Sequence, residues 1–229
     1  MIDRLYTTLQ VIATKDVRGN LSPEDFNLLL NNVIEEKYEE YFYDLNRHLN
    51  RQNRGLTNNG FASIGERISE KLRHYYQSKD VNSLNDVYTV PDTARFVDSI
   101  YHTNKEVEIV KSAKLFYLMN NSDHISPKAS RPIALETGRE YTLAPDTLTG
   151  AITFFYLRNP LKAKWTYEAI TGLYNPDAQD HQDVDMHPSE EQDILRRLVS
   201  KAGVNLNDQE LAKYGIVEQN KEFQENITP

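Results

Sequence analysis

The residues best suited to chemistry lie together in one short stretch, Asp180-His181-Gln-Asp183-Val-Asp185-Met-His187. Carboxylates and imidazoles that alternate along an extended segment can point to one side and bind a divalent cation. Asp183, Asp185, His181 and His187 are therefore the candidate metal ligands, and a metal-dependent hydrolase is the enzyme class they would serve. A catalytic metal site usually takes its ligands from several elements of a rigid scaffold. We therefore favour a solvated acidic connector, with no metal and no other cofactor.

No other pattern in the sequence points to catalysis. The nine glycines are scattered, so neither a phosphate-binding loop nor a dinucleotide-binding glycine pattern occurs. A Gly-x-Ser-x-Gly elbow is also missing, and the lack of cysteine excludes thiol nucleophiles, thiolate metal sites and disulfides. His48, His74, His102 and His124 have no matching partners in the sequence. We predict that the chain has no catalytic residues and is not an enzyme.

The composition narrows the possible partners. The 229 residues carry a net charge of −8, and no cluster of basic side chains suggests a grip on nucleic acid. An acidic surface could still line a passage through which DNA slides. The 14 tyrosines suit half-wet protein contacts, or they simply fill strand positions. No signal-peptide pattern and no apolar stretch of about 20 residues occurs, so we expect folding in the cytoplasm and no membrane role.

The N-terminal part is expected to be helical. Apolar residues recur at helical spacing from Ile2 to Ile12, and Ser22-Pro-Glu-Asp25 is a strong helix start. The helix that follows keeps one apolar face, including Tyr41 and Phe42, over about 40 Å. Such a length favours a strut against neighbouring subunits over an ordinary core helix. An acidic face at 35–40 is either solvated or repels a DNA backbone.

A second helix is expected at 61–75, folding back antiparallel on the first, with a loop at 78–85. Short runs typical of strands then alternate with turn residues, and no helix-sized crossover separates them, so antiparallel pairing is expected. These runs are 86–90, 94–101, 114–119, 139–143 and 151–158. Trp165, the only tryptophan, follows the break at Asn159-Pro160 and is expected to anchor the sheet to the helices.

The C-terminal part is expected to contain a connector at 175–188 and a helix from Ser189 to Ala202, ended by Gly203. A short helix would begin at Asn207, and a polar tail would follow. The predicted fold is thus α+β: an N-terminal long-helix hairpin, a small antiparallel sheet, and C-terminal helices with an extended arm. The regions are 1–85, 86–174, 175–216 and 217–229, within one integrated domain.

Several motifs also resemble a known family. Tyr156-Leu-Arg-Asn-Pro160 with Trp165-Thr-Tyr167, the acidic run at 180–185, and Lys201-Ala-Gly-Val-Asn-Leu206 followed by Asn207-Asp-Gln-Glu210 carry the resemblance. They are similar to structural proteins of tailed phages that infect Bacteroidetes, including the crAss-like group. The resemblance is clearest over 148–214.

That resemblance implies a virion neck protein, a ring-forming connector between portal and tail, with no catalytic residues. Copies of the chain in a twelve-fold or six-fold ring, the portal and other neck or tail proteins would be its partners, and genomic DNA would pass through. We predict that Trp165, Tyr156 and Arg158, with Tyr41 and Phe42 on the long helix, contact neighbouring subunits. Another tail or baseplate adaptor is the alternative.

Overall fold

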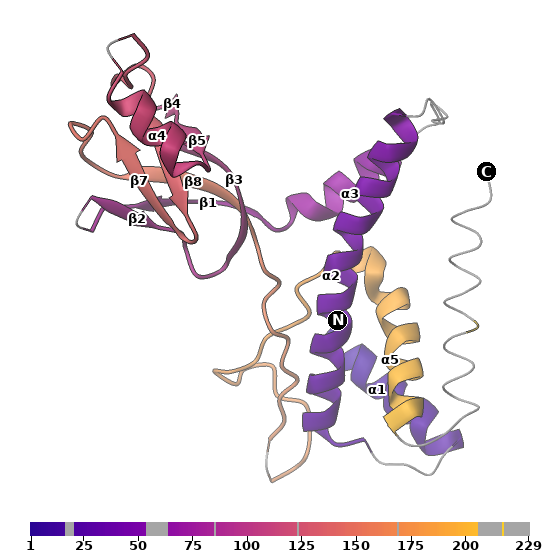
Figure 1. Ribbon diagram of the computed structural model, residues 1–229. Helices are drawn as coiled ribbons and strands as arrows, with labels where there is room; N and C mark the ends of the chain where they lie inside the picture. Colours follow the sequence, from indigo (N-terminus) through magenta and orange to yellow (C-terminus); the bar gives the residue numbers. More distant parts are fainter. Residues whose placement is uncertain are drawn as a thin grey trace. The chain divides into compact units, whose positions relative to one another are not determined.

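The computed structural model describes residues 1–16, 21–53, 64–84, 86–122, 124–168, 170–205 and 217. Contacts divide the chain into two compact units. The helical unit comprises Met1–His74 with Pro160–Pro229, and the β unit comprises Tyr75–Asn159 (Figure 1). The predicted α+β class is therefore confirmed. The regions expected from the sequence divide the chain differently, since residues 75–85 belong to the β unit and 160–174 to the helical unit.

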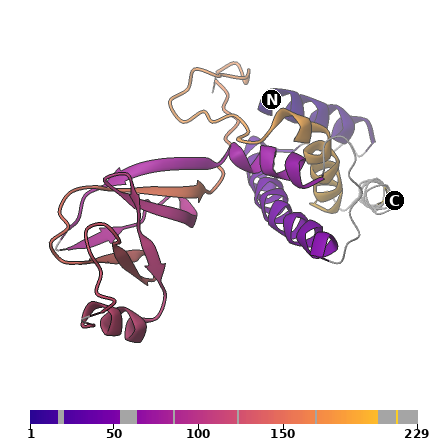
Figure 2. The same cartoon turned by 90° about the horizontal axis from the view of Figure 1, so that it is seen from above.

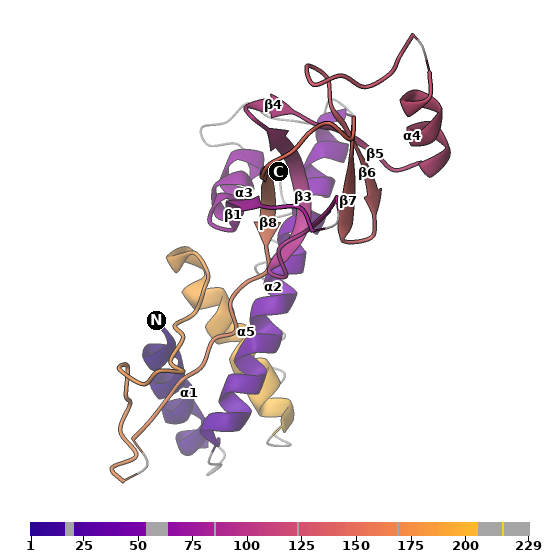
Figure 3. The same cartoon turned by 90° about the vertical axis from the view of Figure 1, so that its left-hand side faces the viewer.

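The described residues of the helical unit form four α-helices and one 3-10 turn. They are α1 (Ile2–Asp16), α2 (Pro23–Asn53), α3 (Ile64–Arg73), η1 (Pro188–Glu190) and α5 (Glu191–Asn205). Helix α5 packs against both α1 and α2, and α3 packs against α2 (Figures 1 and 3). From Pro160 to His187, which precedes η1, the described residues form a long loop with no helix, and this loop lies beside α1 (Figure 2). No helix in the described part of the chain is long and apolar enough to cross a membrane.

Helix α2 begins as the sequence predicts. The Ser22 hydroxyl accepts the N–H of Asp25 at 3.1 Å and donates to its carboxylate at 2.7 Å, so the cap satisfies a free donor of the first turn. Its apolar face is buried, with Phe26, Leu30 and Tyr38 at most 2 % exposed. At 31 residues the helix is about 46 Å long, given a rise of ~1.5 Å per residue.

The helix predicted at 61–75 ends earlier, at Arg73, and the C-terminal helix predicted at 189–202 differs at both ends. Helix α3 begins at Ile64, and the turn of the expected hairpin, 54–63, lies outside the described residues. Helix α5 does not end at Gly203 but continues to Asn205, and the turn before it is capped by His187 instead of Ser189. The helix expected from Asn207 and, apart from Val217, the tail at 217–229 also lie outside the described residues.

The β unit contains two four-stranded sheets within its described residues, with strand orders β1-β8-β3-β4 and β2-β7-β6-β5. The elements of this unit are β1 (Tyr76–Val81), β2 (Val87–Thr89), β3 (Ala94–His102), β4 (Lys105–Glu106), β5 (Glu108–Val110), α4 (Ala113–Asn120), β6 (Ile133–Thr137), β7 (Glu140–Ala144) and β8 (Ile152–Arg158). The β3–β4 turn uses Thr103 and Asn104, both at positive φ, as a two-residue hairpin requires.

The core of the β unit lies between its two sheets. Along β8 buried and half-buried residues alternate, as expected for a strand with one face inside. Phe154 on this strand is fully buried and meets Tyr141 of β7 edge to face, with ring centroids 5.4 Å apart. Buried residues of both sheets thus form one hydrophobic cluster, which holds the sheets face to face.

Three predictions for the β unit are wrong. The run at 114–119 is not a strand: it forms α4, whose first turn is capped by the Ser112 hydroxyl. The first four residues of the loop expected at 78–85 belong to strand β1. Two sheets replace the single one. Antiparallel pairing is confirmed for the other strand pairs, but β5 and β6 pair in parallel. Helix α4 lies between β5 and β6 in the sequence and forms part of the crossover that connects them. A parallel pair needs such a crossover.

Candidate functional site

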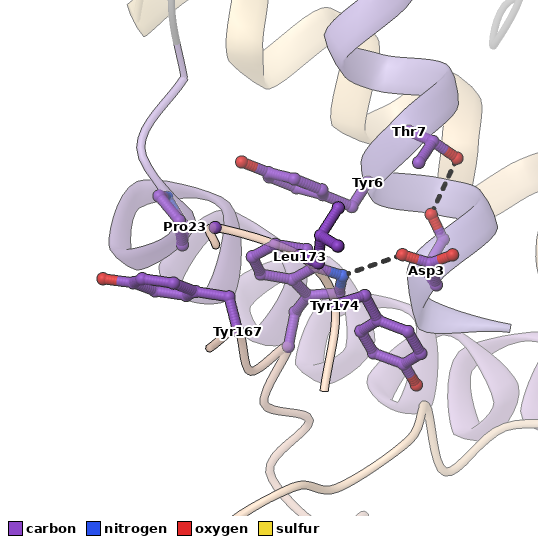
Figure 4. Close-up of a pocket in the computed structure, with 9 residues that line it drawn as sticks. Asp3, Tyr6, Thr7, Pro23, Tyr167, Leu173 and Tyr174 are labelled. Carbon is purple, nitrogen blue, oxygen red and sulfur yellow. Dashed lines mark hydrogen bonds between the residues drawn. The ribbon is translucent and has the colours of Figure 1, made fainter. Parts of the chain in front are cut away.

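Four aromatic rings at the N-terminal end of α1 line a pocket of about 520 Å³ (Figure 4). We call it the aromatic pocket. Its walls come from α1, the start of α2 and the long loop; the lining residues are Asp3, Tyr6, Thr7, Pro23, Trp165, Tyr167, Gly172, Leu173 and Tyr174. Tyr167 and Leu173 are 48 % and 69 % exposed, so the loop side of the pocket is accessible from solvent.

Two asparagines one helical turn apart on α2 hold the long loop in place. The Asn27 side chain accepts the N–H of Trp165 at 2.7 Å and donates to its carbonyl at 3.1 Å. Asn31 makes the same pair of hydrogen bonds with Ala163, both at 2.9 Å. The extended segment at 163–165 therefore bonds to a helix as it would to a neighbouring strand, and the position of Trp165 is fixed.

The indole of Trp165 is the centre of the aromatic pocket. It lies 4.0 Å from the ring of Tyr6 and stacks at 5.8 and 5.9 Å with Tyr167 and Tyr174. Its Nε1–H donates to Oδ1 of Asp3 at 3.1 Å, and only 5 % of the residue is exposed. All of these contacts lie inside the helical unit. Trp165 thus anchors the long loop to α1 and α2, which corrects the prediction that it joins the sheet to the helices.

The charge of the aromatic pocket is negative. The nine described residues that line it include the Asp3 carboxylate and no basic side chain. Burial first, and then the negative charges of Asp183 and Asp3, raise the pKa of the Tyr174 hydroxyl. The Thr7 hydroxyl donates to the Asp3 main-chain carbonyl at 2.8 Å, so it stabilises the helix turn. Aromatic faces beside a carboxylate are suited to binding a cationic group.

Of the four predicted metal ligands, the two aspartates bind main-chain donors. Asp183 accepts the N–H groups of Ile2 and Val184, both at 2.8 Å, and the amino group of Met1 at 3.1 Å. Burial raises the pKa of the Asp183 carboxyl, but these donors outweigh burial and hold the pKa below its usual value. Asp185 contacts Nε2 of His74 at 2.8 Å and accepts the N–H of Leu161 at 2.8 Å.

The two histidines of the stretch have separate partners. His181 lies 3.3 Å from the Thr166 hydroxyl and 3.2 Å from the Tyr174 hydroxyl. His187 contacts the hydroxyl of Ser189 at 2.8 Å and caps η1. Across the part of the chain that the structure describes, no group of three or more His, Asp or Glu side chains is arranged to hold a metal ion.

The interpretation of 175–188 as a solvated connector is wrong for 184–186, whereas most of 175–183 is exposed. Val184, Asp185 and Met186 are all at most 9 % exposed, because the segment packs inside the helical unit. Its polar side chains contact several parts of the unit: Asp183 binds the start of α1, Asp185 binds His74 and Leu161, and His187 binds η1. Asp180 and His181 bind other residues of the long loop. The stretch therefore works as a structural clasp, and His74, for which the sequence offered no partner, is one of the groups it holds.

A largely buried ionic cluster joins α2, α3, η1 and α5. Its members are Lys37, Glu40, Lys71, Glu190, Asp193 and Arg197. Lys37 lies at its centre, with Nζ 2.5 Å from Asp193 and 3.2 Å from both Glu190 and Glu40. Burial alone would lower the pKa of Lys37, but the three carboxylates outweigh it and raise the pKa well above its ordinary value. Nothing local in the sequence marks this cluster.

The residues predicted to contact neighbouring subunits are mostly interior. Trp165, Tyr156, Arg158 and Tyr41 are at most 8 % exposed, and Phe42 is half-buried. Tyr156 belongs to the core of the β unit, and the Arg158 guanidinium lies 5.5 Å from the ring of Tyr75. Their packing inside the chain corrects the expectation that they form an outer contact surface in this structure.

An exposed apolar surface exists elsewhere, on α4. Leu115, Tyr117 and Leu118 are 49 %, 58 % and 59 % exposed, and Ile125 just beyond the helix is 56 % exposed. We call these four residues the α4 patch. The helix lies at the margin of the β unit (Figure 3). The sequence pattern of this run predicts a strand, so the patch is not apparent from the sequence.

Comparisons with known proteins give no family for this chain. No protein-family model matches the sequence, and no curated protein is detectably similar to it.

Proposed function

We propose that this chain is a structural subunit of a tailed-phage virion, a ring-forming connector of the neck between portal and tail. In this role it catalyses no reaction. It assembles in the host cytoplasm and becomes part of the virion. Copies of itself, the portal and other neck or tail proteins are its partners. The motifs at 156–167 and 201–210 that resemble such proteins support this proposal.

The observation that carries the proposal is the α4 patch. Three large apolar side chains on one eight-residue helix are each about half exposed or more, and the helix has a single charged residue, Lys114. Scattered apolar residues are normal on a monomer, but a gathered group of this kind marks a surface that another protein covers. In a ring, the patch of one subunit would meet a different surface of the next copy, and the contact would close after a full turn.

The acidic balance of the chain is consistent with the same role. The net charge is −8, and Glu35 and Glu39 are exposed on α2, whereas Glu36 and Glu40 already pair with Lys201 and Arg197. Carboxylates that face a lumen would repel the phosphate backbone, so DNA could pass without binding.

The experiment is a measurement of mass in solution by light scattering, with negative-stain imaging of the same sample. We expect closed rings of twelve or six copies for the unchanged chain and a monomer for the variant Leu115→Ser/Leu118→Ser. Leu84→Ser is the matched control, because Leu84 is 77 % exposed and lies outside the α4 patch. A chain that remains monomeric at every concentration would contradict ring formation, and a double variant that still forms rings would exclude the patch as the contact.

A further inference from the structure

We propose that the aromatic pocket is a binding site for a cationic side chain, an arginine of a partner polypeptide. The proposal depends on the pocket alone and holds whether or not the chain is a connector subunit. The volume, about 520 Å³, is in the range of ordinary ligand sites and leaves room for an arginine together with its neighbouring residues.

The geometry selects a cation with a flat, apolar face. Tyr167 presents a half-exposed ring, and its orientation is fixed because it stacks on the buried indole of Trp165 at 5.8 Å and 24°. A guanidinium can stack on such a ring through its flat, weakly hydrated face. An ammonium group has no such face, because it is a compact point charge.

The charged group of the pocket is the carboxylate of Asp3, which Figure 4 shows across the pocket from Tyr167. Its Oδ1 is occupied by Nε1–H of Trp165, whereas Oδ2 accepts no hydrogen bond from any residue that the structure describes. Since no basic side chain lines the pocket, the negative charge of Asp3 is not neutralised there. A neutral apolar ligand would leave this carboxylate partly desolvated and without a partner, which is unfavourable.

Trp165 makes the proposal directly measurable. It is the only tryptophan of the chain, so its fluorescence reports on this pocket and on no other site. The full chain is titrated with the peptide Ac-Gly-Arg-Gly-NH2 and, in parallel, with the peptide in which citrulline, a neutral isostere, replaces arginine. We expect saturable binding of the arginine peptide near or below about 1 mM, and binding of the citrulline peptide weaker by about fivefold or more, as loss of a cation–π contact implies.

Two variants test the two halves of the site. Tyr167→Leu removes the exposed ring, and Asp3→Asn removes the charge while it retains an oxygen that can accept from the Trp165 indole. Each is expected to weaken binding of the arginine peptide by about fivefold or more. Tyr43→Leu is the matched control and should leave binding unchanged, because Tyr43 is 67 % exposed and does not line the pocket. Circular dichroism verifies that each variant is folded.

Four results would overturn the proposal. The first is no saturation by about 10 mM peptide, which is weaker than useful recognition requires, and the second is equal affinity for the citrulline peptide. The others are full affinity in folded Asp3→Asn and an equal loss in Tyr43→Leu. Choline is titrated as a further probe. If choline binds and the arginine peptide does not, the pocket takes a quaternary ammonium headgroup instead of a peptide.

Discussion

Removing the charge at the centre of the ionic cluster should destabilise the helical unit strongly. In Lys37→Met the side-chain stem is retained and only the ammonium group is lost. Glu190 and Asp193, whose side chains are 4 % and 7 % exposed, would then keep their charges with fewer partners. Removing one member of a buried ion pair typically costs about 3–5 kcal/mol.

The expected cost is at the lower end of that range. After the substitution Glu190 still contacts Lys71, and Asp193 still contacts Arg197 at 3.1 Å, so neither carboxylate is left alone. We therefore expect the free energy of unfolding to fall by about 3 kcal/mol. For a chain of this length, that corresponds to a decrease in Tm of about 6–12 °C.

The assay is unfolding in urea, followed by the fluorescence of Trp165, which lies in the helical unit. Lys201→Met is the matched control: Lys201 also joins α5 to α2, at 2.7 Å from Glu36, but these side chains are 30 % and 52 % exposed. A surface pair of this kind is worth about 1 kcal/mol or less. If Lys37→Met and Lys201→Met lower stability equally, the reasoning from burial is refuted.

Further substitutions address the clasp, the loop and the predicted metal. The pKa of Asp183 is lowered in the folded chain, so its charge stabilises the fold above the ordinary carboxyl pKa. This stabilisation is lost as the pH falls through the folded pKa. Asp183→Asn should therefore lower Tm at pH 7 and have no effect in strong acid. Burial first, then Glu40, raises the pKa of Asp44, so the sign reverses and Asp44→Asn should raise Tm at pH 7. Asn31→Ala leaves both main-chain groups of Ala163 without their partner and should cost about 1–3 kcal/mol in urea unfolding. Metal analysis of the purified chain should find no stoichiometric divalent ion at 180–187, and one that disappears in His181→Ala/His187→Ala would contradict the clasp.

Features encoded by near neighbours were predictable from the sequence. The cap at Ser22 and the apolar spacing of α1 depend on residues three or four positions apart, and both are present. The alternation along β8 is equally local, and the strand forms where it was expected. These patterns depend on the local backbone geometry of neighbouring residues, so they can be recognised without knowledge of the rest of the fold.

The run at 114–119 shows where such local reasoning is ambiguous. In Lys-Leu-Phe-Tyr-Leu-Met, apolar and polar residues neither alternate nor recur at helical spacing, so the run fits either a buried strand or a helix. The deciding signal was Ser112, whose hydroxyl accepts the N–H of Leu115 and begins α4. If this cap is not recognised, the run is predicted as a strand and the α4 patch is not apparent from the sequence.

The candidate site depends on contacts that sequence spacing does not reveal. Asn27 and Asn31 are poor helix formers on one face of a helix, which is a weak sign of another role. Their partners, however, lie 138 and 132 residues away. The same is true of Lys37 and Glu190, whose pairing joins the first quarter of the chain to its last.

Composition alone cannot separate a metal site from a clasp, because both use carboxylates and imidazoles. The difference lies in what already occupies the lone pairs. Asp183 accepts two main-chain N–H groups and an amino group, and Asp185 accepts a main-chain N–H and contacts a histidine. A cation would have to displace these donors and leave buried N–H groups without partners, at a cost of about 1–3 kcal/mol each. The Asp3 carboxylate is different: its Oδ1 accepts the Trp165 indole N–H, and its Oδ2 accepts no hydrogen bond from any described residue, so a cation that binds there displaces no donor.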